Sequence, residues 1–176
     1  GTIAKLPGVT EGIHPIYARH FIQRIRYASN DPLLQGEIDK GRFVEDCVYS
    51  DKTSVVSIPT KNTILDKFEE DIIEQVDEIS LDDLFRVQAW FQTIWADNAV
   101  SFTANIDPQT KPSELEASLR RWLQFLKGTT VFPDLSRPQS PYERIDQQTF
   151  LELTAQSEVE TGQAFDECQT GACPVR

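Results

Sequence analysis

Between residues 53 and 132, segments with strand character alternate with segments of helical spacing. The strand-like segments are rich in β-branched or alternating apolar residues, and they are Thr53–Ile58, Ala99–Ile106 and Thr129–Phe132. The helical segments repeat apolar residues every three or four positions, and they are Asn62–Val76, Ser80–Trp95 and Ser113–Lys127. A proline follows each strand closely, which is where a sheet tolerates one. This order predicts an α/β fold in which helical crossovers join the strands of a mostly parallel sheet.

The composition is that of a globular protein. Of the 176 residues, 39% are hydrophobic and 26% are charged, which is enough apolar material for one core. The formal net charge of -11 argues against nucleic acid or an anionic membrane as a partner, because both attract clustered positive charge. No apolar run is long enough to cross a bilayer, and Gly1–Leu6 does not resemble a signal peptide. With only three cysteines, we expect a cytoplasmic protein.

The basic residues of the first part of the chain gather in Ile13–Ala28, which carries Arg19, Arg24 and Arg26. Alternation at the end of this stretch predicts a strand over Gln23–Tyr27. The arginines could meet the phosphate or ribose of a nucleotide. More often, arginines in so acidic a chain pair with its own carboxylates.

His14, His20 and Cys47 lack the spacing that is typical of metal ligands. We therefore predict no metal site. Structural roles are expected for both histidines, and a half-buried cysteine such as Cys47 usually packs as a small hydrophobe.

Two cysteines, Cys168 and Cys173, lie close together near the end of the sequence. Gly171 between them permits backbone angles that would bring the thiols together, and Gln156–Thr161 upstream is polar. We expect residues 156–176 to form a flexible tail. A structural disulfide closing so small a loop would stabilise little. A redox pair and a frayed end with two incidental thiols both fit the spacing.

The first segment, Gly1–Gly12, contains small residues and is interrupted by Gly8 and Gly12. Thr2 and the neighbouring amides could cap a helix or hold an anion. On local grounds a plain turn followed by a short helical segment fits better, because the full glycine-rich signature of a phosphate loop is missing.

Taken together, several stretches resemble the C-terminal part of adenosylcobalamin-dependent (class II) ribonucleotide reductases. The residues that carry the resemblance are GTIAKLPGVTEGIHPIYARHFIQRIR, WADNAVSFTANIDP, PYERI and ECQTGACPVR. The resemblance runs from Gly1 to Arg176, and the first and last stretches are its most specific parts. It implies a ten-stranded α/β barrel of two five-stranded halves, of which residues 1–155 would supply the last strands and helices. Residues 156–176 would be the family's redox-active tail.

The resemblance also implies a chemistry. In this family adenosylcobalamin generates a thiyl radical, a ribonucleotide is reduced at its 2′ carbon, and a pair of active-site cysteines becomes a disulfide. Cys168 and Cys173 match the tail dithiol that re-reduces this disulfide and is itself reset by thioredoxin-like proteins. Gly1, Thr2 and Ile3 match the end of the loop that binds the substrate phosphates.

The chain departs from the family pattern because the radical cysteine, the paired active-site cysteines and the effector-binding region have no counterpart in it. We therefore expect it to be inactive alone and to pair with a larger N-terminal reductase chain, which would hold most of the adenosylcobalamin site. The alternative is a non-catalytic, reductase-derived scaffold or regulatory partner. A stand-alone thiol–disulfide carrier ranks last, because Cys-x-x-Cys at a helix start is absent.

Overall fold

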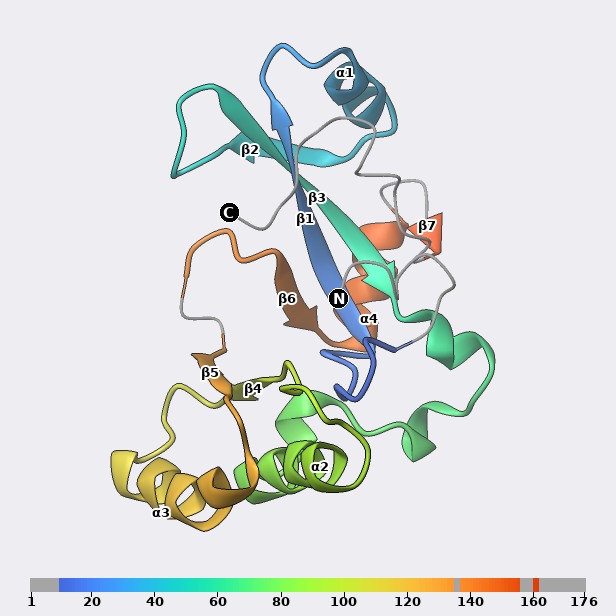
Figure 1. Ribbon diagram of the computed structural model, residues 1–176. Helices are drawn as coiled ribbons and strands as arrows, with labels where there is room; N and C mark the ends of the chain where they lie inside the picture. The colour runs from blue at the N-terminus through green and yellow to red at the C-terminus, as the bar shows by residue number, and fades with distance from the viewer. Residues whose placement is uncertain (1–9, 135–136, 156–159, 162–176) are drawn as a thin grey trace. The chain divides into compact units, whose positions relative to one another are not determined.

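The computed structural model describes residues 10–134, 137–155 and 160–161, the last two by their backbone alone (Figure 1). These residues belong to two compact units. Unit 1 contains residues 18–72 together with 137–155 and 160–161, and unit 2 contains residues 10–17 together with 73–134. Each unit is therefore assembled from segments that lie far apart in the sequence.

Unit 1 is built on a sheet of five strands in the order β2-β3-β1-β6, with β7 also paired to β3. The strands are β1 (His20–Ala28), β2 (Phe43–Asp46), β3 (Thr53–Lys61), β6 (Tyr142–Ile145) and β7 (Glu160–Thr161). β1 pairs antiparallel with β3 and β6, and β2 pairs antiparallel with β3, whereas β7 runs parallel to β3. The long strands β1 and β3 are thus the frame of this unit (Figure 1).

The core of unit 1 lies where alternate residues of β1 and β3 are apolar. Ile25 stands opposite Val56 in the register of the two strands, so that both side chains leave the same face of the sheet. The buried cluster on this face comprises Ile25, Tyr27, Leu34, Val56 and Ile58. Leu34 belongs to helix α1 (Pro32–Asp39), which thereby covers this face, and helix α4 (Gln147–Thr154) follows β6.

Unit 2 combines two parallel strands with two helices (Figure 1). Its elements are η4 (Val76–Glu78), α2 (Leu81–Ile94), β4 (Thr103–Ile106), α3 (Pro112–Trp122), η5 (Leu123–Phe125) and β5 (Thr130–Pro133). Because β4 and β5 are parallel, α3 and η5 form the crossover between them. The buried cluster comprises Val76, Leu84, Phe85, Phe102 and Ala104, and Ile13 and Tyr17 pack against it. These two contacts explain why residues 10–17 belong to this unit.

The predicted helices beginning near Ser80 and Ser113 are confirmed as α2 and α3. Ser80 caps α2, since its Oγ accepts a hydrogen bond from the backbone N–H of Asp83 at 3.1 Å. The strand predicted over Gln23–Tyr27 lies within β1. Among the described residues, none of the helices is both long and apolar enough to span a membrane.

The prediction of a mostly parallel sheet is wrong for unit 1. β1, β2 and β3 are joined by connections that reverse the chain direction, so they pair antiparallel, and β6 also pairs antiparallel with β1. The parallel crossover predicted for the middle of the chain occurs in unit 2, between β4 and β5. β3 also continues through Pro59, which stands opposite Ile22 of β1, rather than ending before it.

The helix predicted over Asn62–Val76 is also wrong. This segment forms three separate 3₁₀ turns, η2 (Thr63–Asp66), η3 (Glu70–Ile72) and the start of η4. Asn62 caps η2, and the end of the segment is held by an isolated bridge between Ile16 and Gln75. Apolar spacing alone does not specify a helix when caps and bridges divide the segment into short turns.

The structure adds α1, a helix that is not among the elements predicted above. Asp31 accepts a hydrogen bond from the backbone N–H of Leu33 at 2.9 Å, and Pro32 occupies the first helical turn. Both are standard helix-start signals, so the Asp-Pro pair was the clue to this helix.

Candidate functional site

The predicted site residues all lie outside the part of the chain that the structure describes. This holds for Cys168 and Cys173 of the tail and for Gly1, Thr2 and Ile3 of the phosphate loop. The structure therefore neither brings these residues together nor separates them. The structure does describe the segment that follows the predicted phosphate loop. It also describes the contacts of the other residues considered above, which are the two histidines, the arginines and Cys47.

His14 anchors the segment that follows the predicted phosphate loop. Its Nδ1 lies 2.8 Å from the carbonyl oxygen of Glu11, and its Nε2 lies 3.1 Å from the backbone nitrogen of Thr103. Because a backbone N–H can only donate, Nε2 is the acceptor and the proton lies on Nδ1. The ring stacks on Phe102, with centroids 4.6 Å apart. These contacts confirm a structural role for His14 and fix the entry into unit 2 beside the start of β4.

His20 is a buried ionisable side chain at the start of β1. Its ring lies against Phe150 of α4, with centroids 4.8 Å apart, and its Nδ1 is 3.9 Å from Oε1 of Glu70. Burial lowers the pKa of His20 below its ordinary value of 6.5, and although Glu70 opposes this effect, Lys61 and Arg19 add to it. The imidazole is consequently kept neutral near neutral pH.

The arginines of the basic stretch are engaged within unit 1. Arg24 forms an ion pair with Glu143 of β6 and donates to the carbonyl oxygen of Ser140 at 3.2 Å. Arg26 donates to the carbonyl oxygen of Gln139 at 2.8 Å. The carboxylate-pairing interpretation is thus confirmed for Arg24, and both side chains fasten the segment before β6 to β1.

Arg19 is also engaged within unit 1, because its Nε donates to the carbonyl oxygen of Glu70 at 3.1 Å. Cys47 is buried as a free thiol, as expected of a cysteine that packs as a small hydrophobe.

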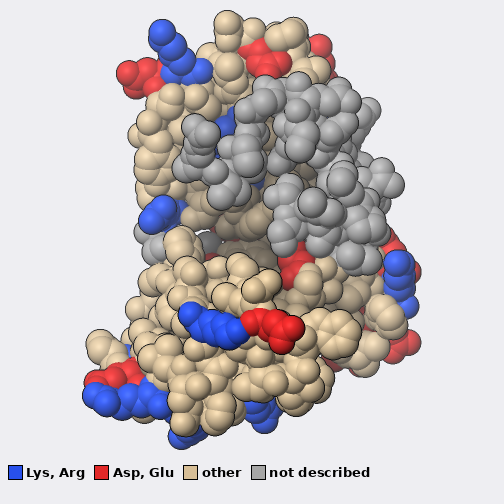
Figure 2. Space-filling view, viewed as in Figure 1, with Lys and Arg blue, Asp and Glu red and all other residues tan. Residues whose placement is uncertain are grey.

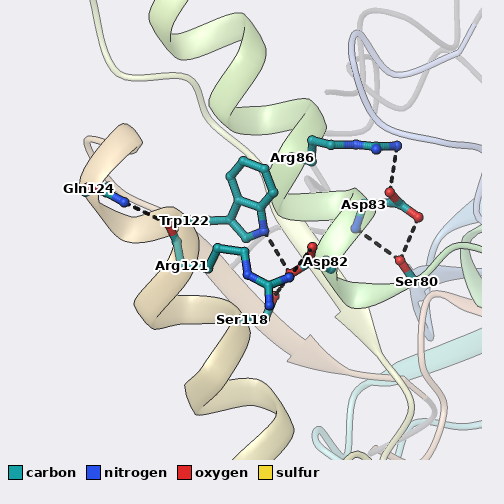
Figure 3. A network of polar contacts seen from close by, with 8 residues as sticks. All are labelled: Ser80, Asp82, Asp83, Arg86, Ser118, Arg121, Trp122 and Gln124. Atoms are coloured by element: carbon teal, nitrogen blue, oxygen red, sulfur yellow. Dashed lines mark hydrogen bonds and ion pairs between the residues drawn. The ribbon is translucent and has the colours of Figure 1, made fainter.

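A polar network centred on Asp82 joins α2 to α3 in unit 2 (Figure 3). Oδ1 of Asp82 accepts hydrogen bonds from Oγ of Ser118 at 3.0 Å and from Nε1 of Trp122 at 2.9 Å. Oδ2 accepts one from Nη1 of Arg121 at 2.9 Å. Burial alone would raise the pKa of Asp82, but these donors together outweigh it and lower the pKa below its ordinary value. The network therefore acts as a clamp between two helices, and its charge is satisfied internally.

Two buried glutamines that sequence reasoning left without a role hold the connection between α2 and β4. Nε2 of Gln88 donates to the carbonyl oxygens of Val100 and Gly128, at 3.1 and 2.7 Å. Gln92 donates to the carbonyl oxygens of Ala96 and Asn98 and accepts from the backbone N–H of Val100. The signal in the sequence was an amide side chain at positions where α2 otherwise places apolar residues.

The chain is similar to known proteins over all of its length. No family model matches the chain. It is 46% identical over 190 residues to a protein of Mycobacterium phage D29 whose name assigns it provisionally to the adenosylcobalamin-dependent ribonucleoside-triphosphate reductases. It is 36% and 33% identical to adenosylcobalamin-dependent ribonucleoside-triphosphate reductases of Levilactobacillus brevis and Lactobacillus leichmannii. All of this chain is covered in each alignment, but only 26–27% of each relative.

The fold gives the same result. All of this chain matches 24% of a chain in a crystal structure of a B12-dependent (class II) ribonucleotide reductase, with a TM-score of 0.70 and 30% sequence identity. The mixed α/β arrangement is accordingly that of a segment of a reductase. The chain belongs to the adenosylcobalamin-dependent, class II ribonucleotide reductases and spans about a quarter of their length.

Proposed function

We propose that this chain is the C-terminal quarter of a class II ribonucleotide reductase and takes part in converting ribonucleotides to deoxyribonucleotides. The observation that carries the proposal is its match over all of its length to proteins named as such reductases, together with the TM-score of 0.70. In this proposal the two units are part of a ten-stranded α/β barrel. The parallel β4–β5 crossover supports it, because a barrel of this kind is assembled from such units.

The proposed role of the tail is to return electrons to the active site. Reduction of a ribonucleotide replaces the 2′-hydroxyl by hydrogen and releases water, while two active-site thiols become a disulfide. A thiolate of Cys168 or Cys173 attacks that disulfide, forms a mixed disulfide with one active-site cysteine and releases the other active-site thiol. The second tail thiol then attacks the tail sulfur of the mixed disulfide and releases the remaining active-site thiol. The active-site thiols are restored and the tail carries the disulfide. A thioredoxin-like dithiol then reduces the tail and is oxidised in its place.

The proposed role of Gly1, Thr2 and Ile3 is to bind the substrate phosphates through backbone amides and the Thr2 hydroxyl. The rigid anchoring of the following segment supports this role. Gly12 adopts a φ of 62° that favours glycine, and His14 then ties the chain to Thr103. A loop that holds phosphate benefits from such a fixed continuation, because less entropy is lost on binding.

Adenosylcobalamin belongs to the chemistry of the relatives by name. The contacts among the described residues do not assign any of them to this cofactor, since Arg24 and Arg26 are used within unit 1. We therefore place the cofactor with the remaining three quarters of the reductase, whether joined to this chain or separate, and we assign no step of this chain to it. The radical cysteine and the paired active-site cysteines belong to the same remainder.

Serine substitution of either tail cysteine tests the proposal. In the complete reductase, Cys168→Ser or Cys173→Ser should abolish multiple turnover with a thioredoxin-like reductant, because no tail disulfide can form. Turnover with dithiothreitol, which is small enough to reach the active site directly, should be spared. The measurement is deoxyribonucleotide formed per enzyme with each reductant.

The matched control is Cys47→Ala, which removes a buried thiol outside the tail and should leave the ratio of the two activities unchanged. Loss of turnover with both reductants in the serine variants would remove the shuttle role. Unchanged turnover with both would favour a reductase-derived scaffold whose tail is a passive remnant.

A further inference from the structure

Helix α2 carries a second apolar face besides the one that packs in the core of unit 2. Leu84, Phe85 and Ala89 are buried on the inner side. A further set of apolar side chains lies at spacings of three and four residues, which places them along one side of a helix. We call this set the outer α2 face, and its members are Val87, Trp90, Phe91, Ile94 and Trp95.

Most of the outer α2 face is open to solvent. The exposed fractions are 54% for Trp90, 65% for Ile94 and 83% for Trp95. A helix at the surface of a completed domain usually has one apolar stripe and a polar opposite side, and a helix that is apolar on most sides is usually buried. Exposed aromatic side chains that adjoin one another mark an interaction surface more often than isolated ones do.

Charged groups lie at the two ends of the face. Arg86 pairs with Asp83 at the start of α2, and Nζ of Lys127 donates to the carbonyl oxygen of Asp97 beyond its end. In Figure 2 the surface of unit 2 turned to the viewer is mainly tan, with a blue and a red side chain side by side across its middle and further charged side chains toward its lower edge. An apolar centre with polar groups at its margin is the usual anatomy of a protein interface.

The face is also held in place before anything binds to it. The chain after Trp95 is fixed by Gln92, which bonds to Ala96, Asn98 and Val100, and by Gln88, which bonds to Val100. Trp90 and Phe91 contact each other edge to face, with centroids 4.9 Å apart. A preformed surface loses little conformational entropy on docking.

We propose that the outer α2 face docks against an apolar face of the remaining part of the reductase, an inference that rests on the proposed function. The length of the relatives identifies this occupant, because the chain covers only 27% of the phage relative and 24% of the chain of known structure. A segment cut from a longer fold exposes the apolar faces that its missing neighbours cover. The outer α2 face is such a face.

Residue-level footprinting tests this directly. Hydroxyl-radical oxidation followed by mass spectrometry should modify Trp90 and Trp95 readily in the isolated chain and about tenfold more slowly in the complete reductase, since docking excludes water from both rings. Trp122, whose Nε1 already bonds to Asp82, is the internal control and should change little. Equal oxidation of Trp90 and Trp95 in both states would overturn the proposal.

A pair of charge substitutions gives a second test. Ile94→Glu and Trp95→Glu should leave the isolated chain folded by circular dichroism, because both side chains are already exposed. They should weaken its binding to the remainder of the reductase by about tenfold or more, since docking would bury an unpaired carboxylate. Thr93→Glu, an exposed position beside the face on the same helix, should bind normally.

The outcomes separate this inference from the proposed function. If Ile94→Glu and Trp95→Glu bind as tightly as the wild type, the docking surface is overturned. The proposed role of the tail dithiol is unaffected by that result, because it is tested separately by comparing the two reductants. Concentration-dependent self-association of the isolated chain that Trp95→Glu abolishes, with assembly into the reductase unaffected, would show that a second copy covers the face and would also overturn the proposal.

Discussion

The pKa of His20 is determined by the residues packed around it in the fold. Its ring is 4% exposed and packs on Phe150, yet Glu70 lies close enough to favour the charged form. Desolvation wins, so the pKa of His20 is lowered. The consequence is a pH dependence of stability whose sign can be stated.

The unfolded chain binds a proton at His20 near the ordinary pKa of 6.5, whereas the folded chain does so only at lower pH. Between these two values the unfolded state holds more protons, so the free energy of unfolding should fall as the pH drops below about 6.5. Urea unfolding of the chain between pH 7.5 and pH 5.5 measures this. In His20→Gln the fall over this range should be smaller, and an equal fall in both proteins would contradict the assignment.

Asp82 offers a prediction of stability at the same scale. Asp82→Ala removes the acceptor for Ser118, Trp122 and Arg121 and a favourable negative charge in the first turn of α2. We expect it to lower the free energy of unfolding by about 1–3 kcal/mol. Thermal or urea unfolding monitored by tryptophan fluorescence measures the loss.

The control for Asp82 is Glu116→Gln on α3. Glu116 pairs with Arg120 four residues on, and both side chains are well exposed. Such a pair contributes little, so this substitution should change stability by less than about 0.5 kcal/mol. Equal effects of the two substitutions would mean that the clamp is not specific.

At the scale of elements, the connection between α2 and β4 depends on Gln92. Its Oε1 accepts from the backbone N–H of Val100 at 2.9 Å, and Gln92→Ala leaves this N–H without that acceptor. Amide hydrogen exchange of Val100 should therefore become about tenfold faster or more, because exposing this N–H to water no longer requires breaking its hydrogen bond to Gln92. Thr93→Ala on the same helix is the comparison, and Val100 should exchange there as in the wild type.

The elements also show what a sequence can and cannot predict. α2 and α3 were predictable because a helix-start signal adjoins the apolar spacing in each: Ser80 caps α2, and Pro112 occupies the first turn of α3. Residues 62–76 also begin at a capping residue, Asn62, and have apolar spacing, yet they form separate 3₁₀ turns, so these local signals do not suffice there. β3 continues through Pro59, and β1 pairs with it on both sides of this residue although proline has no backbone N–H. The local rule that a proline ends a strand does not foresee this.

For the whole molecule, the family was predictable from motifs at the two ends of the chain, and the comparisons confirm it. The arrangement of the middle was not predictable in the same way. Antiparallel pairing of β1 with β6 joins residues more than a hundred positions apart, and no local pattern encodes such a contact. The predicted site lies in the end segments, so its roles remain predictions for the reductase assays above.

The discontinuous sheet of unit 1 has a consequence for biosynthesis. β1 needs β6 as its second neighbour, but unit 2 lies between them in the sequence. At roughly 5–20 residues per second, β1 and β3 leave the ribosome several seconds before β6 is made. Unit 2 can fold first, while one edge of β1 remains unpaired in the nascent chain and can pair incorrectly with another strand. The order of translation thus makes β1 the strand that a chaperone would have most reason to protect.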